Sequence, residues 1–343
     1  MMRIRPISLA DLPSLMQLVK ATGVGLTTLP SNEAALSRRI EASLASFAGT
    51  AQKADELFLF VLEDIAAKRV VGTCGLATAV GLRQAWYSYR VGLAVHASQE
   101  LEVFTQTQTL SLTNDHTGHS ELCSLFLAPD YRRDRNGLLL SKSRFLFIAQ
   151  HRERFSKKII AELRGVADDN GQSPFWESLG RRFFSMEFSQ ADYLTGIGRK
   201  SFVAELMPKH PLYTTFLSPE AQAAIGETHP HTLAARRMLE SEGFRYEGYV
   251  DIFDAGPTVE CDVADVNAVA ASKLYRAEIR DQPPAADAPY YLVSTTGIAD
   301  YRATLVQANP TADVFPLSSE TAAVLGVSAG KDLRAVALSV SDR

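Results

Sequence analysis

LFLAPDYRRDRNGLLL, at residues 125–140, is the stretch that decides the fold. An apolar strand stops at Pro129, a polar turn follows, and a helix then begins. The first N–H groups of a helix have no acceptor within the helix, and the helix dipole adds partial positive charge there. The stretch therefore predicts an anion site suited to a pyrophosphate, where Gly137 allows close backbone approach and Arg132 and Arg135 add charge.

The end of the same strand has a second consequence for a ligand. If the sheet splays open there, an extended acyl-pantetheine arm can pair with free backbone groups as an added strand would. The oxygen of the thioester would then be held by a backbone N–H near Leu127. The structural alternative is an ordinary strand–turn–helix with exposed arginines, which a short glycine motif alone does not exclude.

The rest of the chain predicts strands and helices in an order typical of a mixed sheet. Trp86–Val95 and Glu102–Leu112 alternate polar and apolar residues, which predicts a long hairpin with one solvated face. Other strands are expected at Ile4–Ile7, Leu57–Leu62, Arg69–Thr73, Glu121–Leu127, Lys158–Leu163 and Tyr246–Phe253. Helices are expected at Ser8–Val19, Ser31–Phe47, Asn136–Phe155, Pro174–Phe184 and Thr232–Glu242. We predict an α/β or α+β fold with helices on both faces of the sheet.

Two regions depart from this pattern. Residues 188–230 show no strong periodicity and are expected to form loops and short helices. A proline-rich linker at residues 281–289 separates the last part of the chain. Residues 290–343 then alternate short strands with one helix at Ser319–Leu325, similar to a segment of double-psi-type β-barrels. We predict a small β-rich, barrel-like module there.

The composition excludes several classes of protein. The chain has 343 residues, a formal net charge of −4 and 46% hydrophobic residues, too apolar for a disordered chain and not basic enough for a typical nucleic-acid binder. No apolar run is long enough for a membrane helix, and no signal peptide is recognisable. Cys74, Cys123 and Cys261 are too few and too far apart for a disulfide framework or a thiolate metal site. We expect a cytoplasmic protein without a metal, and neither nucleic acid nor membrane as a partner.

The loop before the helix also resembles the acyl-CoA-binding signature of the GNAT superfamily. That signature is an Arg/Gln-x-x-Gly-x-Gly/Ala loop following a strand. Arg132 and Gly137 keep its first and last places, while Arg135 replaces its middle glycine. Residues 173–180 and 234–244 are each similar to a later helix of the superfamily, which implies a duplicated or extended core.

This resemblance implies three units. The first, at residues 1–200, is a GNAT-like acyl-CoA-binding domain. The second, at residues 201–280, is a further GNAT-like half that contains His229. The third, at residues 281–343, is the small β-rich module.

Three longer motifs resemble the arginine N-succinyltransferase family: Gly23–Pro30 (GVGLTTLP), Gly226–Pro230 (GETHP) and Phe253–Pro257 (FDAGP). The resemblance implies transfer of succinyl from succinyl-CoA to the α-amine of L-arginine in arginine catabolism, with ornithine as a second acceptor. It also implies an α-type subunit, in a hetero-oligomer with a paralogous β subunit or in a homo-oligomer.

The family resemblance assigns roles to two residues. His229, in the GETHP motif, becomes the proton donor, and Leu125 becomes a main-chain contact to succinyl-CoA. A departing thiolate needs a neighbouring acid of suitable pKa, and a histidine meets that need. By itself, one histidine among seven is more often structural, so the motif match carries the assignment. The proton of the attacking amine can pass to His229, Glu227 or a water.

The charges of the substrates need partners of opposite sign. Candidates for the guanidinium group of arginine are Glu227, Asp251, Asp254 and Glu260. Candidates for the succinyl carboxylate are Arg132, Arg133 and basic residues of the N-terminal helices. The histidine pairs 229/231 and 116/119 lack the further ligands that a metal site requires.

Two other functions fit the same sequence. Because the loop lacks its middle glycine, the chain is alternatively a non-catalytic or partner-dependent subunit of a paired succinyltransferase. The second alternative is an N-acyltransferase that acts on another acceptor.

Overall fold

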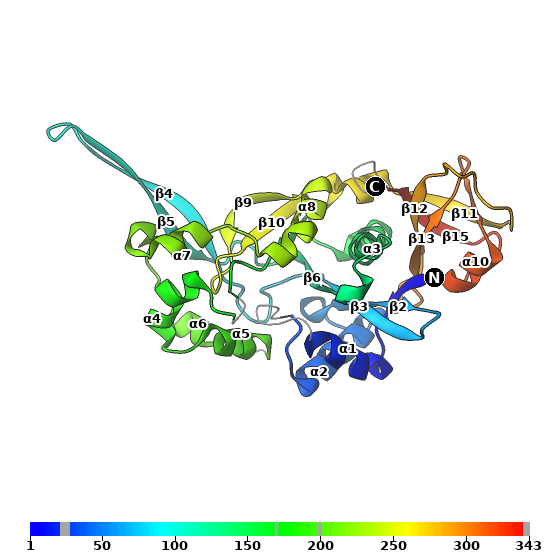
Figure 1. Cartoon of the computed structure of the whole chain (residues 1–343), viewed down its shortest axis with the longest axis horizontal. Helices are drawn as coiled ribbons and strands as arrows, with labels where there is room; N and C mark the ends of the chain where they lie inside the picture. Colours follow the sequence, from blue (N-terminus) through cyan, green and yellow to red (C-terminus); the bar gives the residue numbers. More distant parts are fainter. Residues whose placement is uncertain (21–27, 169–170, 198–200, 339–343) are drawn as a thin grey trace.

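The computed structural model describes residues 1–20, 28–168, 171–197 and 201–338. Its strands form one hydrogen-bonded series in the order β14-β11-β15-β12-β13-β1-β2-β3-β6-β7-β10-β9-β4-β5-β8. Both parallel and antiparallel pairs occur, and helices cover both faces of the central strands (Figure 1). The predicted mixed α/β fold is confirmed.

The central strands are β1 (Met2–Pro6), β2 (Leu57–Asp64), β3 (Arg69–Ala77), β6 (Ser120–Leu127) and β7 (Lys158–Glu162). The first four pair antiparallel in chain order, and β7 lies parallel to β6. Each of these strands overlaps a range that the sequence pattern predicted.

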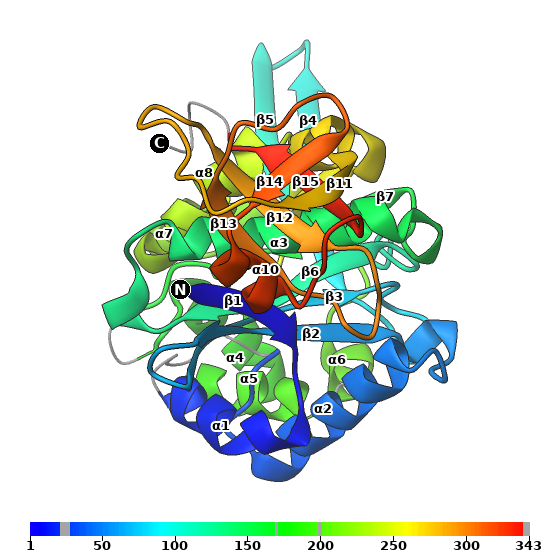
Figure 2. The same cartoon turned by 90° about the vertical axis from the view of Figure 1, so that its right-hand side faces the viewer.

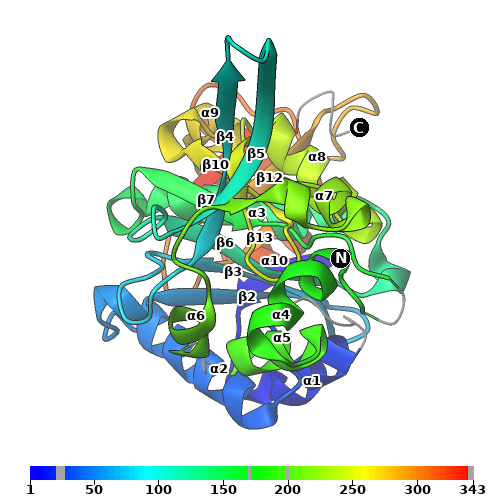
Figure 3. The same cartoon turned by 90° about the vertical axis from the view of Figure 1, so that its left-hand side faces the viewer.

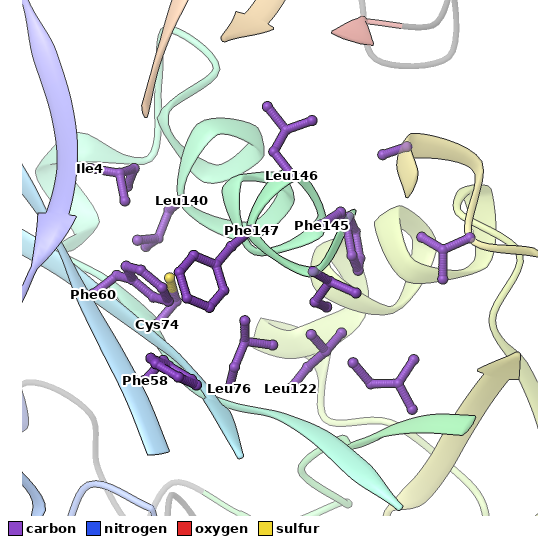
Figure 4. Close-up of a cluster of buried hydrophobic side chains, with 14 of the residues drawn as sticks. Ile4, Phe58, Phe60, Cys74, Leu76, Leu122, Leu140, Phe145, Leu146 and Phe147 are labelled. Atoms are coloured by element: carbon purple, nitrogen blue, oxygen red, sulfur yellow. The ribbon is translucent and has the colours of Figure 1, made fainter. Parts of the chain in front are cut away.

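Helix α3 (Asn136–Gln150) packs on one face of these strands, and α1 (Leu12–Lys20) and α2 (Glu33–Phe47) pack on the other (Figure 1). The ring of Phe147 in α3 lies 5.2 Å from the ring of Phe60 in β2, in the core cluster drawn in Figure 4. This burial holds α3 on the sheet and so fixes where the helix begins, next to the end of β6.

Two strand pairs extend the sheet beyond β7. First come β10 (Pro257–Asp262) and β9 (Arg245–Val250), followed by the hairpin of β4 (Ser88–Ser98) and β5 (Val103–Thr113). The hairpin projects from the body of the molecule as a long arm (Figure 1). The hairpin was predicted from its alternating pattern, although its tip is exposed on both faces.

The region without clear periodicity forms short helices. A π-helical turn at Trp176–Gly180 leads into α4 (Arg181–Phe184), and α5 (Phe188–Gly196) follows. Next come α6 (Ser201–Leu206), β8 (Leu212–Tyr213) and α7 (Pro219–Ala224). Helices α4, α5 and α6 lie on the same side of the sheet as α1 and α2 (Figure 3). They pack around Trp176, whose ring stacks on Phe184 at 5.3 Å, so aromatic contacts and not amphipathic periodicity hold them.

Two further helices lie on the α3 side of the sheet. Helix α8 (Leu233–Ser241) ends before Gly243, whose φ of 102° suits a glycine after a helix, and α9 (Asn267–Ala271) follows β10. Leu239 of α8 joins the same core cluster as α3. None of the helices within the described residues has the length and apolar character needed to cross a membrane.

The C-terminal module contains β12 (Tyr290–Thr295), β13 (Ala303–Gln307), β14 (Val314–Leu317) and β15 (Asp332–Ala337) (Figure 2). Strand β11 (Lys273–Ile279) lies before the predicted module boundary at residue 281, yet it pairs with β14 and β15 of the module. The helix α10 (Ser319–Leu325) of this module has the predicted bounds. The module joins the body because β13 pairs with β1 and the Tyr301 hydroxyl donates to the carbonyl oxygen of Ser143 in α3 at 2.6 Å. The division into units at 1–200, 201–280 and 281–343 stays a prediction.

Candidate active site

Strands β6 and β7 separate along their length. In the described residues they pair only at Ser120 with Ile159 and at Glu121 with Ile160, although β6 continues to Leu127. A cavity of about 690 Å³ opens beyond the last pair. Its wall comes from β6, from residues 161–164, from the start of α3 and from α8. This is the splayed strand end that an added pantetheine strand requires.

The start of α3 supplies free hydrogen-bond donors to this cavity, called the donor cavity below. The N–H groups of Gly137 and Leu138 have no backbone acceptor among the described residues, and both residues line the cavity wall. A Cβ atom built on Gly137 would meet no heavy atom within 4 Å. The helix start therefore presents two N–H groups and the positive end of a dipole to open space.

The loop arginines have different surroundings. Arg132 is exposed and donates from Nε to the carbonyl oxygen of Leu127 at 3.1 Å. Arg135 adopts the left-handed conformation (φ 61°) that the missing glycine would take more easily, and its guanidinium lies 4.2 Å from the ring centre of Tyr290. The substitution therefore keeps a glycine-like backbone at the loop. Arg132, Arg133 and Arg135 all line the donor cavity.

A bulge in β6 lies next to Leu125. Ser124 has a φ of 54°, and the pairing of β6 with β3 shifts register opposite it. Two groups from the other face of the sheet bind this serine: its N–H donates to the Thr28 hydroxyl at 3.1 Å, and Arg39 donates to its Oγ at 3.1 Å. The bulge redirects the backbone just where Leu125 and Leu127 line the cavity.

His229 lies beside the donor cavity and not in its wall, which includes the neighbouring His231. The imidazole of His229 is 8% exposed, and its Nδ1 accepts the N–H of His231 at 3.2 Å. An imidazole that accepts at Nδ1 carries its proton on Nε2, so neutral His229 offers a hydrogen-bond donor at that atom. Its backbone N–H donates to the carbonyl oxygen of Arg164 at 2.8 Å, which ties the GETHP motif to the segment after β7.

The FDAGP motif meets the same segment. Asp254 is fully buried and accepts the N–H of Gly165 at 2.8 Å and the N–H of Gly256 at 2.9 Å. Burial raises the pKa of the Asp254 carboxyl well above its ordinary value, and the nearby Asp251 carboxylate raises it further. The two motifs and the chain after β7 therefore form one connected corner of the donor cavity.

A second cavity, of about 250 Å³, lies against the first and shares Thr28, Glu162, Asp251 and Phe253 with it. Its other charged lining residue is Arg39. Glu162 and Arg39 belong to no recognisable sequence motif. They come together only because α2, β7 and the loop after β9 meet in the folded chain. This second cavity is called the acceptor cavity below.

The four carboxylates proposed for the guanidinium are distributed unevenly. Asp251 and Asp254 line the donor cavity, whereas Glu227 is exposed and belongs to neither cavity wall. Glu260 forms a hydrogen bond with Nε2 of His116 at 3.3 Å and an ion pair with Lys158. The structure therefore gives Glu260 a structural role and leaves two of the four acids near the cavities.

Replacing Glu260 with glutamine should lower the free energy of unfolding at pH 7 by about 1 kcal/mol, the net scale of one protein hydrogen bond. The hydrogen bond to His116 lowers the pKa of Glu260 to about 2, with Lys158 contributing. A lowered pKa stabilises the fold above the unfolded value of 4.5, and this stabilisation is lost as the pH falls through about 2. Urea unfolding at pH 7 and pH 3 should show a smaller difference between variant and parent at pH 3. An equal difference at both pH values would contradict this account.

The described residues contain no group of three or more histidine, cysteine, aspartate or glutamate side chains arranged to hold a metal ion. His116 and His119, one of the two candidate pairs, lie instead in the Glu260 cluster, with ring centres 5.6 Å apart. Most of the GVGLTTLP motif lies outside the described residues; Thr28 is the part that reaches the cavities.

Comparison with known proteins gives one consistent answer. A family model described as the arginine N-succinyltransferase beta subunit matches residues 2–268, and one described as its C-terminal domain matches residues 275–337. The arginine N-succinyltransferase of Enterobacter sp. (strain 638) is 54% identical over 338 residues, which cover 98% of each chain. That of Citrobacter koseri is 52% identical over 343 residues, covering 100% of this chain and 99% of the other.

A solved structure extends the comparison to three dimensions. Arginine/ornithine succinyltransferase subunit AI from Pseudomonas aeruginosa superposes with a TM-score of 0.90 at 34% identity and covers 98% of both chains. The chain therefore belongs to the arginine N-succinyltransferase family.

Proposed function

We propose that this chain transfers the succinyl group of succinyl-CoA to the α-amine of L-arginine, with ornithine as a second acceptor. Beyond family membership, one observation supports this proposal most. The donor cavity opens where β6 and β7 separate, has the free N–H groups of Gly137 and Leu138 in its wall and adjoins a second cavity with Glu162 and Asp251.

Succinyl-CoA would lie along β6. Its pyrophosphate would accept from the N–H groups of Gly137 and Leu138, with Arg132 and Arg135 adding positive charge. The pantetheine arm would pair with the backbone of β6 at Leu125 and Leu127, where β7 no longer occupies that edge. No metal takes part in this scheme.

The reaction joins the α-nitrogen of arginine to the thioester carbonyl carbon, and the carbon–sulfur bond then breaks. A backbone N–H near Leu127 would stabilise the oxyanion of the tetrahedral intermediate. The departing CoA thiolate would take a proton from His229 in its imidazolium form, because a neutral imidazole is too weak an acid to protonate a thiolate. The attacking amine loses its own proton to a base at the cavity or to water.

Mixing the purified chain with succinyl-CoA and L-arginine, and following release of the CoA thiol, tests the proposal. We expect steady release that needs both substrates, with N-succinylarginine as the product. Release that appears only after a partner subunit is added would favour the partner-dependent reading. A preference for acetyl-CoA or for another amine would favour a different N-acyltransferase.

The long arm supports a further proposal, that the chain is an α-type subunit that assembles with copies of itself or with a paralogous subunit. Leu93, Leu101 and Phe104 near its tip are 62%, 72% and 63% exposed. A two-stranded hairpin with uncovered apolar side chains is marginally stable alone, so burial against another subunit would stabilise it. The matching family models are described as the beta subunit, so the α type stays a prediction.

Assembly through the arm predicts that a double replacement of Leu93 and Phe104 by aspartate reduces the molar mass in solution. Light scattering at micromolar concentration should report an oligomer for the parent chain and a smaller species for the variant. An unchanged oligomer, with circular dichroism showing an intact fold, would remove the arm from the interface.

A further inference from the structure

The acceptor cavity lies on the face of the sheet opposite α3. Side chains alternate along a strand, and Ala161 and Leu163 join the core cluster on the α3 side, so Glu162 between them faces the other way. Part of the wall comes from α2, α5 and α6 on that face, through Arg39, Thr195 and Val203. A molecule in this cavity would approach the thioester from the side opposite α3.

The charges of this cavity are few and of mixed sign. Glu162 and Asp251 are its acids, and Arg39 is its one cation within the described residues. Arg39 donates to Ser124 on β6, which places it at the end of the cavity nearest the thioester contact at Leu125. Asp251 follows β9, which lies beyond β7 and β10 in the sheet order and so farther from β6.

These charges match an amino acid with a cationic side chain. L-Arginine carries two cations, the α-ammonium and the guanidinium, and one carboxylate, against two acids and one cation in the cavity. Trp86, Tyr87 and Phe253 add aromatic faces on which a planar guanidinium can stack. At about 250 Å³ the space is smaller than the ~300–1,000 Å³ of sites for drug-sized ligands, as an amino acid requires.

We propose that this cavity is the acceptor site, in which Asp251 binds the guanidinium, Glu162 binds the α-ammonium and Arg39 binds the α-carboxylate. The proposal rests on the proposed succinyl transfer to arginine and adds the residues that select the acceptor. The order of the strands sets the orientation: the α-amine lies by β6 and β7, next to the thioester, and the guanidinium lies by the loop after β9. The reversed orientation would place the guanidinium of arginine against Arg39.

A second observation supports Asp251 as the guanidinium partner. Its Oδ1 accepts the N–H groups of Phe253 at 2.7 Å and Asp254 at 3.0 Å, which fixes the carboxylate in a tight turn. A fixed carboxylate loses little entropy when it binds a fork-shaped guanidinium.

The test compares L-arginine with citrulline, which has the same length but a neutral end group. Asp251→Asn keeps the Oδ1 acceptor of the turn and removes only the charge. We expect it to lower the ratio of kcat/KM for arginine to that for citrulline by about 10- to 100-fold, the range for a charged hydrogen bond. An unchanged ratio would overturn the assignment of Asp251.

Glu162→Gln serves as the companion variant. Because both acceptors carry an α-ammonium, it should reduce kcat/KM for arginine and citrulline by the same factor, about 10-fold or more, and leave their ratio unchanged. No loss for either acceptor would remove Glu162 from the site. Glu260→Gln is the matched control, since the Glu260 carboxylate is bound to His116 and Lys158. This variant should change neither kcat/KM for the two acceptors nor the ratio between them.

Calorimetric titration of L-arginine into the chain saturated with CoA separates this inference from the proposed function. Binding that weakens about 10- to 100-fold in Asp251→Asn supports the acceptor site even if the parent chain transfers no succinyl. Equal binding by both proteins would overturn the site even if transfer proceeds.

Discussion

Replacement of His229 by asparagine should reduce kcat for succinyl transfer by about 10²- to 10⁴-fold, the usual contribution of a general acid. The departing CoA thiolate would lose its proton donor, whereas the backbone groups that hold the pyrophosphate would be untouched. The Kd for succinyl-CoA, measured by calorimetry, should therefore change less than about threefold. A variant with full turnover would exclude His229 as the donor.

Asparagine is preferable to alanine here because His229 also caps a helical turn. Its Nδ1 accepts the N–H of His231, and asparagine is a good residue for such a capping position. His231→Asn is the matched comparison, because His231 lines the donor cavity and lies two residues away. If His231→Asn lost as much kcat as His229→Asn or more, the proton donor would have to be reassigned to His231.

Replacement of Gly137 by aspartate should weaken CoA binding by about 100-fold or more, since like charges in contact cost several kcal/mol. The new carboxylate would occupy the open space beside the first turn of α3, where the pyrophosphate is proposed to lie. Acidic residues in the first turn of a helix are favourable, so folding should not suffer. Calorimetry with CoA gives the affinity, and thermal unfolding gives the stability.

Gly137→Ala is the sharper control for the same position. A Cβ meets no protein atom there and alanine favours helices, so the variant should be more stable than the parent by about 0.5–1 kcal/mol. If the phosphates approach the backbone at Gly137 as proposed, CoA affinity should nevertheless fall. Higher stability with unchanged affinity would place the pyrophosphate elsewhere.

Much of the fold could be predicted from local sequence patterns. The change from an apolar strand to a helix at Pro129 and Asn136 predicted β6 and α3, and the Gly326 cap predicted the bounds of α10. The short helices between residues 188 and 224 were not resolved individually, because aromatic packing around Trp176 replaces amphipathic periodicity there.

The candidate site was predictable only in part, because local sequence patterns do not show which distant residues meet in the fold. The anion-binding start of α3 is a local property of residues 132–138, so the sequence could indicate it. The acceptor cavity depends on residues far apart in the chain, Arg39, Glu162 and Asp251, which only the tertiary fold brings together. Arg135 departs from the acyl-CoA-binding motif, yet its backbone adopts the left-handed conformation that a glycine favours.

Hydrogen–deuterium exchange with and without saturating CoA tests the location of the donor most directly. Binding in the donor cavity predicts slower exchange of the amides in residues 122–127 and 136–140, with no change in the arm at residues 93–106. The N–H groups of Gly137 and Leu138, which have no backbone acceptor within the described residues, should show the largest protection. Saturated binding that leaves both segments unprotected would contradict a donor site between β6 and β7.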